Sequence, residues 1–343
     1  MTHPQSAMSA ETRETPEAVA RLLANEGPAI ATLGRKLARL APPVVATCAR
    51  GSSDHAASYL KYLLEITAGT PVASIGPSVA SVYHTRLRLA GGLLVSISQS
   101  GRSPDLVALQ AAARDAGALT VAIVNVTDSP LAQQADTVIA LHAGPERSVA
   151  ATKSFVGSLV AAAVLAAAWS DHAALRAAVN ALPATLEQAL HCDWSAASEA
   201  LEQATSLYVL GRGPGFPVAL EAALKCKEVA AIHAEAFSIA EVMHGPLRLV
   251  HERFPVLAFL PDDAAAPSNR AGLADIARAG GRLFTASPLA TPGTRLPSAA
   301  TGHGFTDPIA MVVSFYCFIE AVARARSHDP DHPAHLRKVT KTL

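Results

Sequence analysis

A group of titratable side chains at helical spacing could move protons to and from carbon and oxygen. Glu221, Lys225 and Glu228 are separated by four and three residues, and these offsets return to one face of a helix. His244 follows in Met-His-Gly-Pro, where the glycine and the proline end a helical stretch and leave the imidazole at its terminus. A carboxylate on an apolar helix can act as a general base, and histidine exchanges protons near neutral pH. Spacing alone favours a plainer alternative, in which Glu228 is a surface residue paired with Lys225 or Lys227.

Two hydroxyl-rich turns could hold a phosphate group. An apolar strand over residues 92–97 runs directly into Ser98-Gln99-Ser100-Gly101-Arg102-Ser103, and Pro104 suits the first turn of a following helix. Hydroxyls, free backbone N–H groups and the positive end of a helix then converge, which is a way to bind a phosphomonoester without a metal. Taken alone, this turn is equally well explained by N-capping of the helix. A second turn of the same kind, with Ser52 and Ser53 after Gly51, favours the phosphate site.

Strands and helices must position these residues, and the sequence repeats that arrangement. Residues 113–122 (ARDAGALTVA) align with residues 277–286 (ARAGGRLFTA) at an offset of 164, and Arg50-Gly51 aligns with Arg212-Gly213 at an offset of 162. Each half contains a strand, a glycine turn, a helix, a second strand near residues 93–98 or 255–260, a further helix and a third strand. The alternation predicts an α/β fold of two tandem units, each a doubly wound parallel sheet flanked by helices. Ligands of such sheets bind beyond the carboxyl ends of the strands.

Composition and charge are typical of a two-lobed cytoplasmic enzyme. A chain of 343 residues is long enough for two domains with separate cores. Lys plus Arg and Asp plus Glu both total 28, so the net charge gives no general attraction to nucleic acid or to membranes. Residues 1–21 lack the apolar core of a signal peptide, and the alanine-rich run over residues 155–169 is too short to span a bilayer. The four cysteines are widely scattered, as expected for reduced thiols.

Neither a metal nor a nicotinamide cofactor is expected. The cluster of His328, Asp329, Asp331, His332 and His335 is interrupted by prolines and lacks the helical spacing of a zinc site. The turn over residues 211–215 is rich in glycine, but its third glycine comes one residue too early for a dinucleotide-binding fingerprint, and prolines crowd it. We therefore expect the chemistry to rely on side chains alone, with no cofactor.

From about residue 35 onward the chain resembles the sugar isomerase (SIS) family, above all the isomerase half of glucosamine-6-phosphate synthase. The densest match runs from the Gly-Arg-Gly turn at residue 211 through Ala-Leu-Glu-x-Ala-Leu-Lys-x-Lys-Glu to Ile-His-Ala-Glu-Ala and His-Gly-Pro. Similar blocks occur at residues 51–53, 98–103, 146–153 and 329–338.

The resemblance implies roles for particular residues. It implies that Glu228 transfers a proton between C1 and C2 of a hexose phosphate. It also implies that His244 opens the sugar ring from the neighbouring protomer of a homodimer, and that Lys338, on a closing C-terminal tail, forms a Schiff base with the open-chain ketose. The residues implied to bind the sugar or its phosphate are Ser52, Ser53, Ser98, Gln99, Ser100, Ser103, Val149, Ala151 and Lys225.

The repeat and the resemblance together predict five segments. These are an N-terminal helical extension (1–34), a first SIS domain (35–170), a helical linker (171–200), a second SIS domain (201–327) and a tail that closes the active site (328–343).

The implied reaction interconverts glucosamine 6-phosphate with fructose 6-phosphate and ammonia. Deamination is favoured because only about thirty residues precede the SIS region, where the synthase has a glutaminase domain. The alternatives are an ammonia-dependent or partner-fed synthase, a deaminase or deglycase for a related hexosamine or fructosyl-amine 6-phosphate, and a non-catalytic sugar-phosphate sensor. The identity of the substrate stays open between these alternatives, because Ala151, Arg102 and Ala49-Arg50 depart from the synthase pattern. No nucleic-acid or membrane partner is expected.

Overall fold

The structure, a computed structural model, describes residues 5–338, and the chain forms two compact units. The first unit contains residues 17–146 and 153–180 together with the chain from residue 337. The second unit contains the chain before residue 17, residues 147–152 and residues 181–336. Each unit is therefore built from segments that are distant in the sequence.

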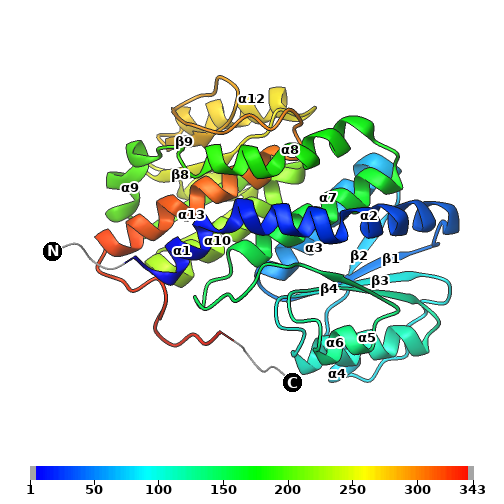
Figure 1. The fold of residues 1–343 in the computed structure, drawn as a ribbon. Coiled ribbons are helices and arrows are strands. Elements are labelled where there is room, and N and C mark those ends of the chain that lie inside the picture. The colour runs from blue at the N-terminus through cyan, green and yellow to red at the C-terminus, as the bar shows by residue number, and fades with distance from the viewer. Residues whose placement is uncertain (1–4, 339–343) are drawn as a thin grey trace. The chain divides into compact units, whose positions relative to one another are not determined.

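A five-stranded parallel sheet forms the middle of the first unit (Figure 1), with the strand order β2-β1-β3-β4-β5. Its strands are β1 (Val45–Cys48), β2 (Val72–Ser74), β3 (Leu93–Ser98), β4 (Leu119–Val124) and β5 (Thr137–Ala140). Every residue of β1 and β3 is buried, as expected for strands that helices cover on both faces. The helices are α2 (Thr15–Leu40), α3 (Ser52–Ala68), α4 (Ser78–Ser81), α5 (Pro104–Asp115), α6 (Pro130–Gln133) and α7 (Lys153–Trp169).

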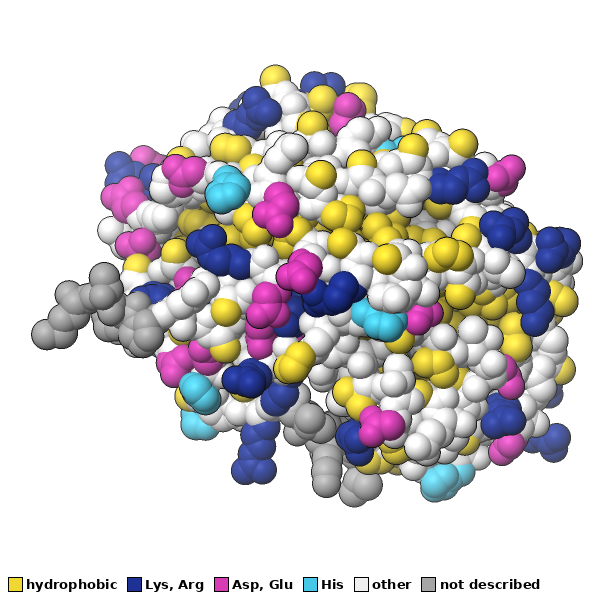
Figure 2. Space-filling model, viewed as in Figure 1, with side chains coloured by type: hydrophobic (Ala, Val, Ile, Leu, Met, Phe, Trp, Pro, Cys, Tyr) yellow, Lys and Arg dark blue, Asp and Glu magenta, His cyan; other side chains and the backbone are white. Residues whose placement is uncertain are grey.

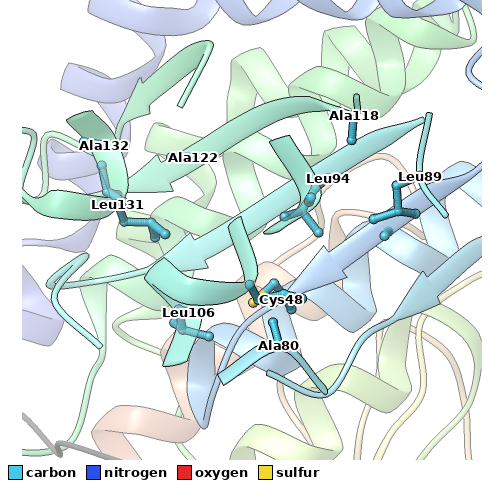
Figure 3. Packing of buried hydrophobic residues seen from close by; sticks show 13 residues of the cluster. Cys48, Ala80, Leu89, Leu94, Leu106, Ala118, Ala122, Leu131 and Ala132 are labelled. Atoms are coloured by element: carbon cyan, nitrogen blue, oxygen red, sulfur yellow. The ribbon is translucent and has the colours of Figure 1, made fainter. Parts of the chain in front are cut away.

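The core of the first unit lies on both faces of this sheet. On one face, Cys48 and Leu94 from the strands pack with Leu106 of α5 and Leu131 of α6 (Figure 3). On the other face, α3 packs against α7 (Figure 1), and all residues of α7 except Val164 are buried. A helix that is apolar all round belongs inside a core, which explains the alanine-rich run. Helices thus cover both faces of the sheet.

The second unit has a five-stranded parallel sheet with the strand order β10-β9-β8-β6-β7. Its strands are β6 (Ser206–Gly211), β7 (His233–Ser238), β8 (Pro255–Phe259), β9 (Arg282–Ala286) and β10 (Thr294–Leu296). The α-helices are α1 (Ala7–Arg13), α8 (Ala173–Ala189, which begins in the first unit), α9 (Ser198–Glu202), α10 (Phe216–Ala230), α11 (Ile239–Val242), α12 (Ala266–Arg278) and α13 (Asp307–Ala325). Short 3-10 turns are η1 (Ser195–Ala197), η2 (Gly213–Gly215) and η3 (Pro246–Leu249).

Helix α13 supports the core of the second unit. It packs against α10, and its Phe315 and Phe318 rings lie 6.3 and 5.9 Å from the Trp194 ring. Of the described helices, α13 alone is long and apolar enough to cross a membrane, but 78% of that span is buried inside the protein. Its apolar character is therefore explained by core packing.

The two sheets have the same topology. In each, the first strand in the sequence lies between the second and the third, so that β6, β7 and β8 correspond to β1, β2 and β3. The predicted α/β fold of two repeated doubly wound units is confirmed. Such an order creates a switch point beside the first strand, where helices that follow neighbouring strands leave in opposite directions and leave room for a ligand.

Charges of both signs are mixed on the protein surface. On the face shown in Figure 2, Lys and Arg side chains alternate with Asp and Glu side chains, in keeping with equal totals of the two kinds. On this face an anion therefore meets no broad cationic patch. Binding of an anionic substrate has to depend on local groups.

We expect Gly101→Ala to destabilise the protein more than Gly69→Ala. Both glycines have φ +61°, so an alanine is strained by about 1–2 kcal/mol at either position. At Gly69 nothing lies within 4 Å of an added Cβ, whereas at Gly101 that atom would lie 2.1 Å from Ser129 Oγ. The overlap should cost roughly a further 1–3 kcal/mol. Urea unfolding of the two variants measures the difference, and equal losses would show that the turn after β3 can relax.

Candidate functional site

The predicted phosphate turns lie side by side at the carboxyl edge of the first sheet. Strands β1 and β3 are hydrogen-bonded neighbours, and each is followed by one of the turns: Ser52 and Ser53 open α3, and Ser98 ends β3. This edge is the switch point of the first sheet. The structure therefore brings together the serines and Gln99 at the place where the fold favours a ligand.

Local hydrogen bonds wind the turn after β3 into a fixed shape. Ser98 Oγ accepts a 3.0 Å hydrogen bond from the Gly101 N–H, and the Gln99 carbonyl accepts one of 3.2 Å from the Asn125 N–H. Ser103 occupies the N-cap position of α5, but its hydroxyl makes no capping hydrogen bond. N-capping by Ser103 therefore does not account for this turn, and its half-buried hydroxyl is available to a ligand.

In the second unit, Glu228, the predicted proton-transfer residue, forms an ion-pair network on α10 with Lys225 and Glu221. Lys225 Nζ lies 3.0 Å from Glu221 Oε1 and 2.7 Å from Glu228 Oε2. The side chains of Lys225 and Glu221 are 1% and 0% exposed, whereas that of Glu228 is 22% exposed. Burial alone would lower the pKa of Lys225, but the adjacent Glu221 and Glu228 raise it above its usual range. Lys225 is thus a permanent cation, and it is a partner of Glu228 in this structure.

Tyr316 extends this network into the core. Its hydroxyl, on α13, donates a 3.0 Å hydrogen bond to Glu221 Oε1, and both side chains are buried. Sequence reasoning missed Tyr316, because no spacing rule connects residues 95 positions apart. The network therefore runs from Tyr316 through Glu221 and Lys225 to Glu228.

Glu228 faces a cavity within the second unit. The cavity has a volume of about 680 Å³ and is lined by residues of α10, including Leu224 and Glu228, and by the segment 327–336. Its size is within the range of small-molecule sites in proteins. Glu228 is the least buried member of the network, so it is the carboxylate that a ligand in this cavity can reach.

Lys338 lies in the first unit, where it is paired with a buried carboxylate. Its Nζ is 3.1 Å from Glu146 Oε2, and the Glu146 side chain is fully buried. Glu146 also accepts hydrogen bonds from the backbone N–H and the hydroxyl of Ser154, at the start of α7. Glu146 and Gln99 line a cavity of about 600 Å³ beyond the ends of β3, β4 and β5. The partner of Lys338 was not predicted, because 192 residues separate it from Glu146.

Val149 and Ala151 belong to a segment that both chain termini hold in the second unit. The carboxylate of Glu11, on α1, accepts hydrogen bonds from the backbone N–H groups of Arg147 and Ser148. The Asp331 carbonyl accepts one of 3.5 Å from the Val149 N–H, while the Asp331 carboxylate caps the first turn of α1. Val149 and Ala151 are both half-buried.

His244 is exposed at the end of a short helix. Helix α11 ends at Val242, and the His244 N–H donates to the Glu241 carbonyl at 2.9 Å. Two apolar side chains near it, Met243 and Leu249, are 40% and 62% exposed. An exposed imidazole among exposed apolar side chains is compatible with a surface that a second protein chain covers.

The candidate residues are thus divided between the units. Ser52, Ser53, Ser98, Gln99, Ser100, Ser103 and Lys338 belong to the first unit, and Val149, Ala151, Lys225, Glu228 and His244 to the second. The first set can bind an anion and present an amine, and in the second set Glu228 and His244 can transfer protons.

The fold is that of a SIS domain protein. The chain belongs to the SIS domain family, whose sequence profile matches residues 44–168 and 200–281. It is 35% identical over 327 residues to the isomerizing glutamine–fructose-6-phosphate aminotransferase of Legionella pneumophila (strain Paris). The matched region covers 90% of this chain and 53% of that enzyme. The enzyme of the same name from Halobacterium salinarum is 36% identical over 307 residues, or 84% of this chain and 50% of that enzyme. The chain spans about half the length of these relatives.

Solved structures give the same assignment. A protein from Silicibacter pomeroyi DSS-3 that is considered a phosphosugar isomerase is 47% identical, with a TM-score of 0.91 over 95% of this chain and 100% of that chain. The C-terminal domain of glucosamine-fructose-6-phosphate aminotransferase from Francisella tularensis is 27% identical, with a TM-score of 0.84 over 96% of this chain and 99% of that chain. A glucosamine-6-phosphate deaminase from Thermotoga maritima is 20% identical and shares the fold, with a TM-score of 0.75 over 98% of this chain and 100% of that chain. These likenesses agree with the assignment to the SIS domain family.

We expect Lys225→Met to destabilise the protein by about 3–5 kcal/mol, because it removes the ammonium that lies 3.0 Å from the carboxylate of buried Glu221. Lys227→Met is the matched control, since Lys227 is exposed two residues away on α10, and it should cost less than about 1 kcal/mol. Adding Glu221→Gln to Lys225→Met should recover part of the loss. Urea unfolding measures all three variants. Equal losses for the two lysines would contradict the ion-pair interpretation.

Proposed function

We propose that this protein interconverts glucosamine 6-phosphate with fructose 6-phosphate and ammonia. The observation that carries the proposal is the cavity-lining carboxylate of Glu228 on α10 of the second unit. Taken by itself, the phosphate-type turn at the switch point of the first sheet supports a phosphorylated substrate. The names of the relatives, which concern fructose 6-phosphate and glucosamine, support an amino sugar phosphate as the substrate.

Proton transfer between adjacent carbons is the central step. In the open-chain amino sugar, Glu228 removes the proton from C2, and the electron pair moves to form an enolamine between C1 and C2. Returning a proton to C1 leaves an imine at C2, which water hydrolyses to the ketose and ammonia. A carboxylate suits this step because it can accept and return the same proton. Lys225 Nζ lies 2.7 Å from Glu228 Oε2 and holds the carboxylate in position.

His244 and Lys338 have supporting roles in this proposal. His244 would open the ring, by donating a proton to the ring oxygen and accepting one from the C1 hydroxyl, within a homodimer in which it serves the partner's substrate. Lys338 would form the Schiff base with the open-chain ketose. The carboxylate of Glu146, 3.1 Å from Lys338 Nζ, is placed to take up the proton that the amine must lose before it attacks.

We expect deamination to be the reaction observed first. The residues that transfer the proton catalyse both directions, but deamination needs only the amino sugar and water, whereas synthesis also needs ammonia. A related hexosamine 6-phosphate or fructosyl-amine 6-phosphate is the second candidate substrate. It is favoured by Ala151, since a methyl group stands where the synthase has a serine hydroxyl for the sugar.

The first test is a product assay. Incubated with glucosamine 6-phosphate, and without added nucleotide, the protein should release equal amounts of ammonia and fructose 6-phosphate. Glu228→Gln should keep substrate binding but lower kcat on the order of 100-fold or more, because an amide cannot accept the carbon-bound proton. Glu187→Gln is the control, since Glu187 is an exposed glutamate of α8 in the same unit.

The assay also separates the alternatives. Turnover of galactosamine 6-phosphate or a fructosyl-amine 6-phosphate alone would keep the mechanism and change the substrate. If no sugar phosphate reacts, and the Gln variant binds sugar phosphate as the wild type does, the protein is a sensor and the enzymatic proposal is wrong.

A second test addresses the homodimer. Inactive His244→Ala protein mixed in equal amounts with inactive Glu228→Ala protein should recover about one quarter of wild-type activity, because half of the dimers are hybrids with one intact site. Subunit exchange is followed in parallel with differently tagged chains. Exchange without any recovery would show that both residues act within one chain.

A further inference from the structure

Arg50 is a half-exposed cation fixed at the switch point of the first sheet. It follows β1 and directly precedes the Gly51-Ser52 turn that opens α3. Its Nε and Nη2 lie 3.0 and 2.9 Å from Asp105 Oδ2, and the Asp105 side chain is fully buried. Asp105 is the second residue of α5. The guanidinium group therefore lies against the first turn of the helix that follows the Ser98 to Ser103 turn.

Arg102, in the same turn, provides an internal comparison. The two arginines are almost equally exposed, at 51% for Arg50 and 53% for Arg102. The closest carboxylate to Arg102 is Asp128, at 3.8 Å, and its side chain is 81% exposed. Such a surface pair constrains the side chain little. Arg50 is held by two hydrogen bonds to a carboxylate that cannot move, so it alone is preorganised.

The Arg50–Asp105 pair presents its positive end to solvent. Asp105 is buried, and its Oδ1 accepts a hydrogen bond from the backbone N–H of Leu106, inside the helix. Two of the guanidinium N–H donors are used on Asp105, and within residues 5–338 the others make no hydrogen bond. The nearest other carboxyl group on α3 is Asp54, whose pKa is raised by burial, although His55 and Arg50 oppose this shift. An anion that approaches this edge from solvent therefore meets a cation with free donors.

We propose that Arg50 recognises the phosphate of the substrate and makes the site selective for a doubly charged phosphomonoester. This inference deepens the proposed function and rests on it for the identity of the sugar. The hydroxyls and backbone N–H groups of the two turns are neutral donors, which bind carboxylates, sulfates and phosphates alike. A guanidinium with free N–H donors adds charge-assisted hydrogen bonds, which strengthen as the anion gains charge. Arg50 acts as a binding residue, with no part in proton transfer.

Binding of inorganic phosphate by calorimetry, together with KM and kcat for glucosamine 6-phosphate, tests this role. Arg50→Gln should raise the Kd for phosphate and the KM roughly 10- to 100-fold, the loss expected for charge-assisted hydrogen bonds, while kcat changes less than about threefold. Arg50→Lys should give a smaller loss, because an ammonium cannot bond Asp105 and a phosphate with the same fork of donors. Arg102→Gln is the matched control and should leave the Kd within about threefold.

A second variant distinguishes loss of phosphate binding from loss of stability. Arg50→Gln alone removes the guanidinium group from buried Asp105 and can unfold the turn. The double variant Arg50→Gln/Asp105→Asn replaces the ion pair with two amides, and it should restore the thermal midpoint while phosphate binding stays weak. Recovery of phosphate binding together with stability would overturn the inference. A wild-type protein that binds no inorganic phosphate would also overturn it, whereas phosphate binding without turnover of any sugar phosphate would contradict only the proposed reaction.

Discussion

A lysine ammonium buried between two carboxylates is the interaction on which the proposed chemistry depends. An ammonium removed from water costs several kcal/mol unless close anions compensate it, and the carboxylates of Glu221 and Glu228 lie 3.0 and 2.7 Å from Lys225 Nζ. Exposure rises along this row, from none at Glu221 to 22% at Glu228. The network therefore presents one carboxylate, that of Glu228, held in place by Lys225, to the cavity beside α10. A general base needs this combination of fixed position and access.

The fold places this base by simple means. Helix α10 begins directly after the turn that follows β6, so its position is set by the central part of the sheet. Offsets of four and three residues then bring the three charges to one face, and α13 adds the Tyr316 hydroxyl from behind. The side chains that hold Glu228 thus come from two helices packed in the core, where motion is small. The base itself is left at the margin of that core.

Sequence reasoning was strongest where local spacing carries the information. Helical offsets predicted the shared face of Glu221 and Glu228, and an apolar run followed by serines predicted a strand and a polar turn at residues 93–103. The internal repeat predicted two sheets of like topology, which is confirmed. Sequence reasoning could not predict the hydrogen bonds of Glu146 with Lys338 or of Tyr316 with Glu221. These join residues that only the folded chain brings together. For the same reason it did not show that Glu11 and Asp331, near the two ends of the chain, hold the segment that contains Val149. The assignment of roles to Glu228, His244 and Lys338 rested on resemblance, and these roles stay predictions.

The repeated topology raises the question of why one switch point should bind phosphate and the other should not. In the first sheet, the turn after β3 carries serines and lies beside Arg50. In the second sheet, the corresponding turn after β8 carries Asp262 and Asp263, and burial raises the pKa of Asp263 above its usual range. This turn is also closely packed. The Asp262 N–H donates to the Asp307 carboxylate, and a Cβ on Gly304 would lie 2.2 Å from the Asp262 carbonyl oxygen. Acidic side chains and a filled turn both oppose a phosphate. These differences agree with the proposed roles, in which the turns of the first unit bind the anion and α10 of the second unit supplies the general base.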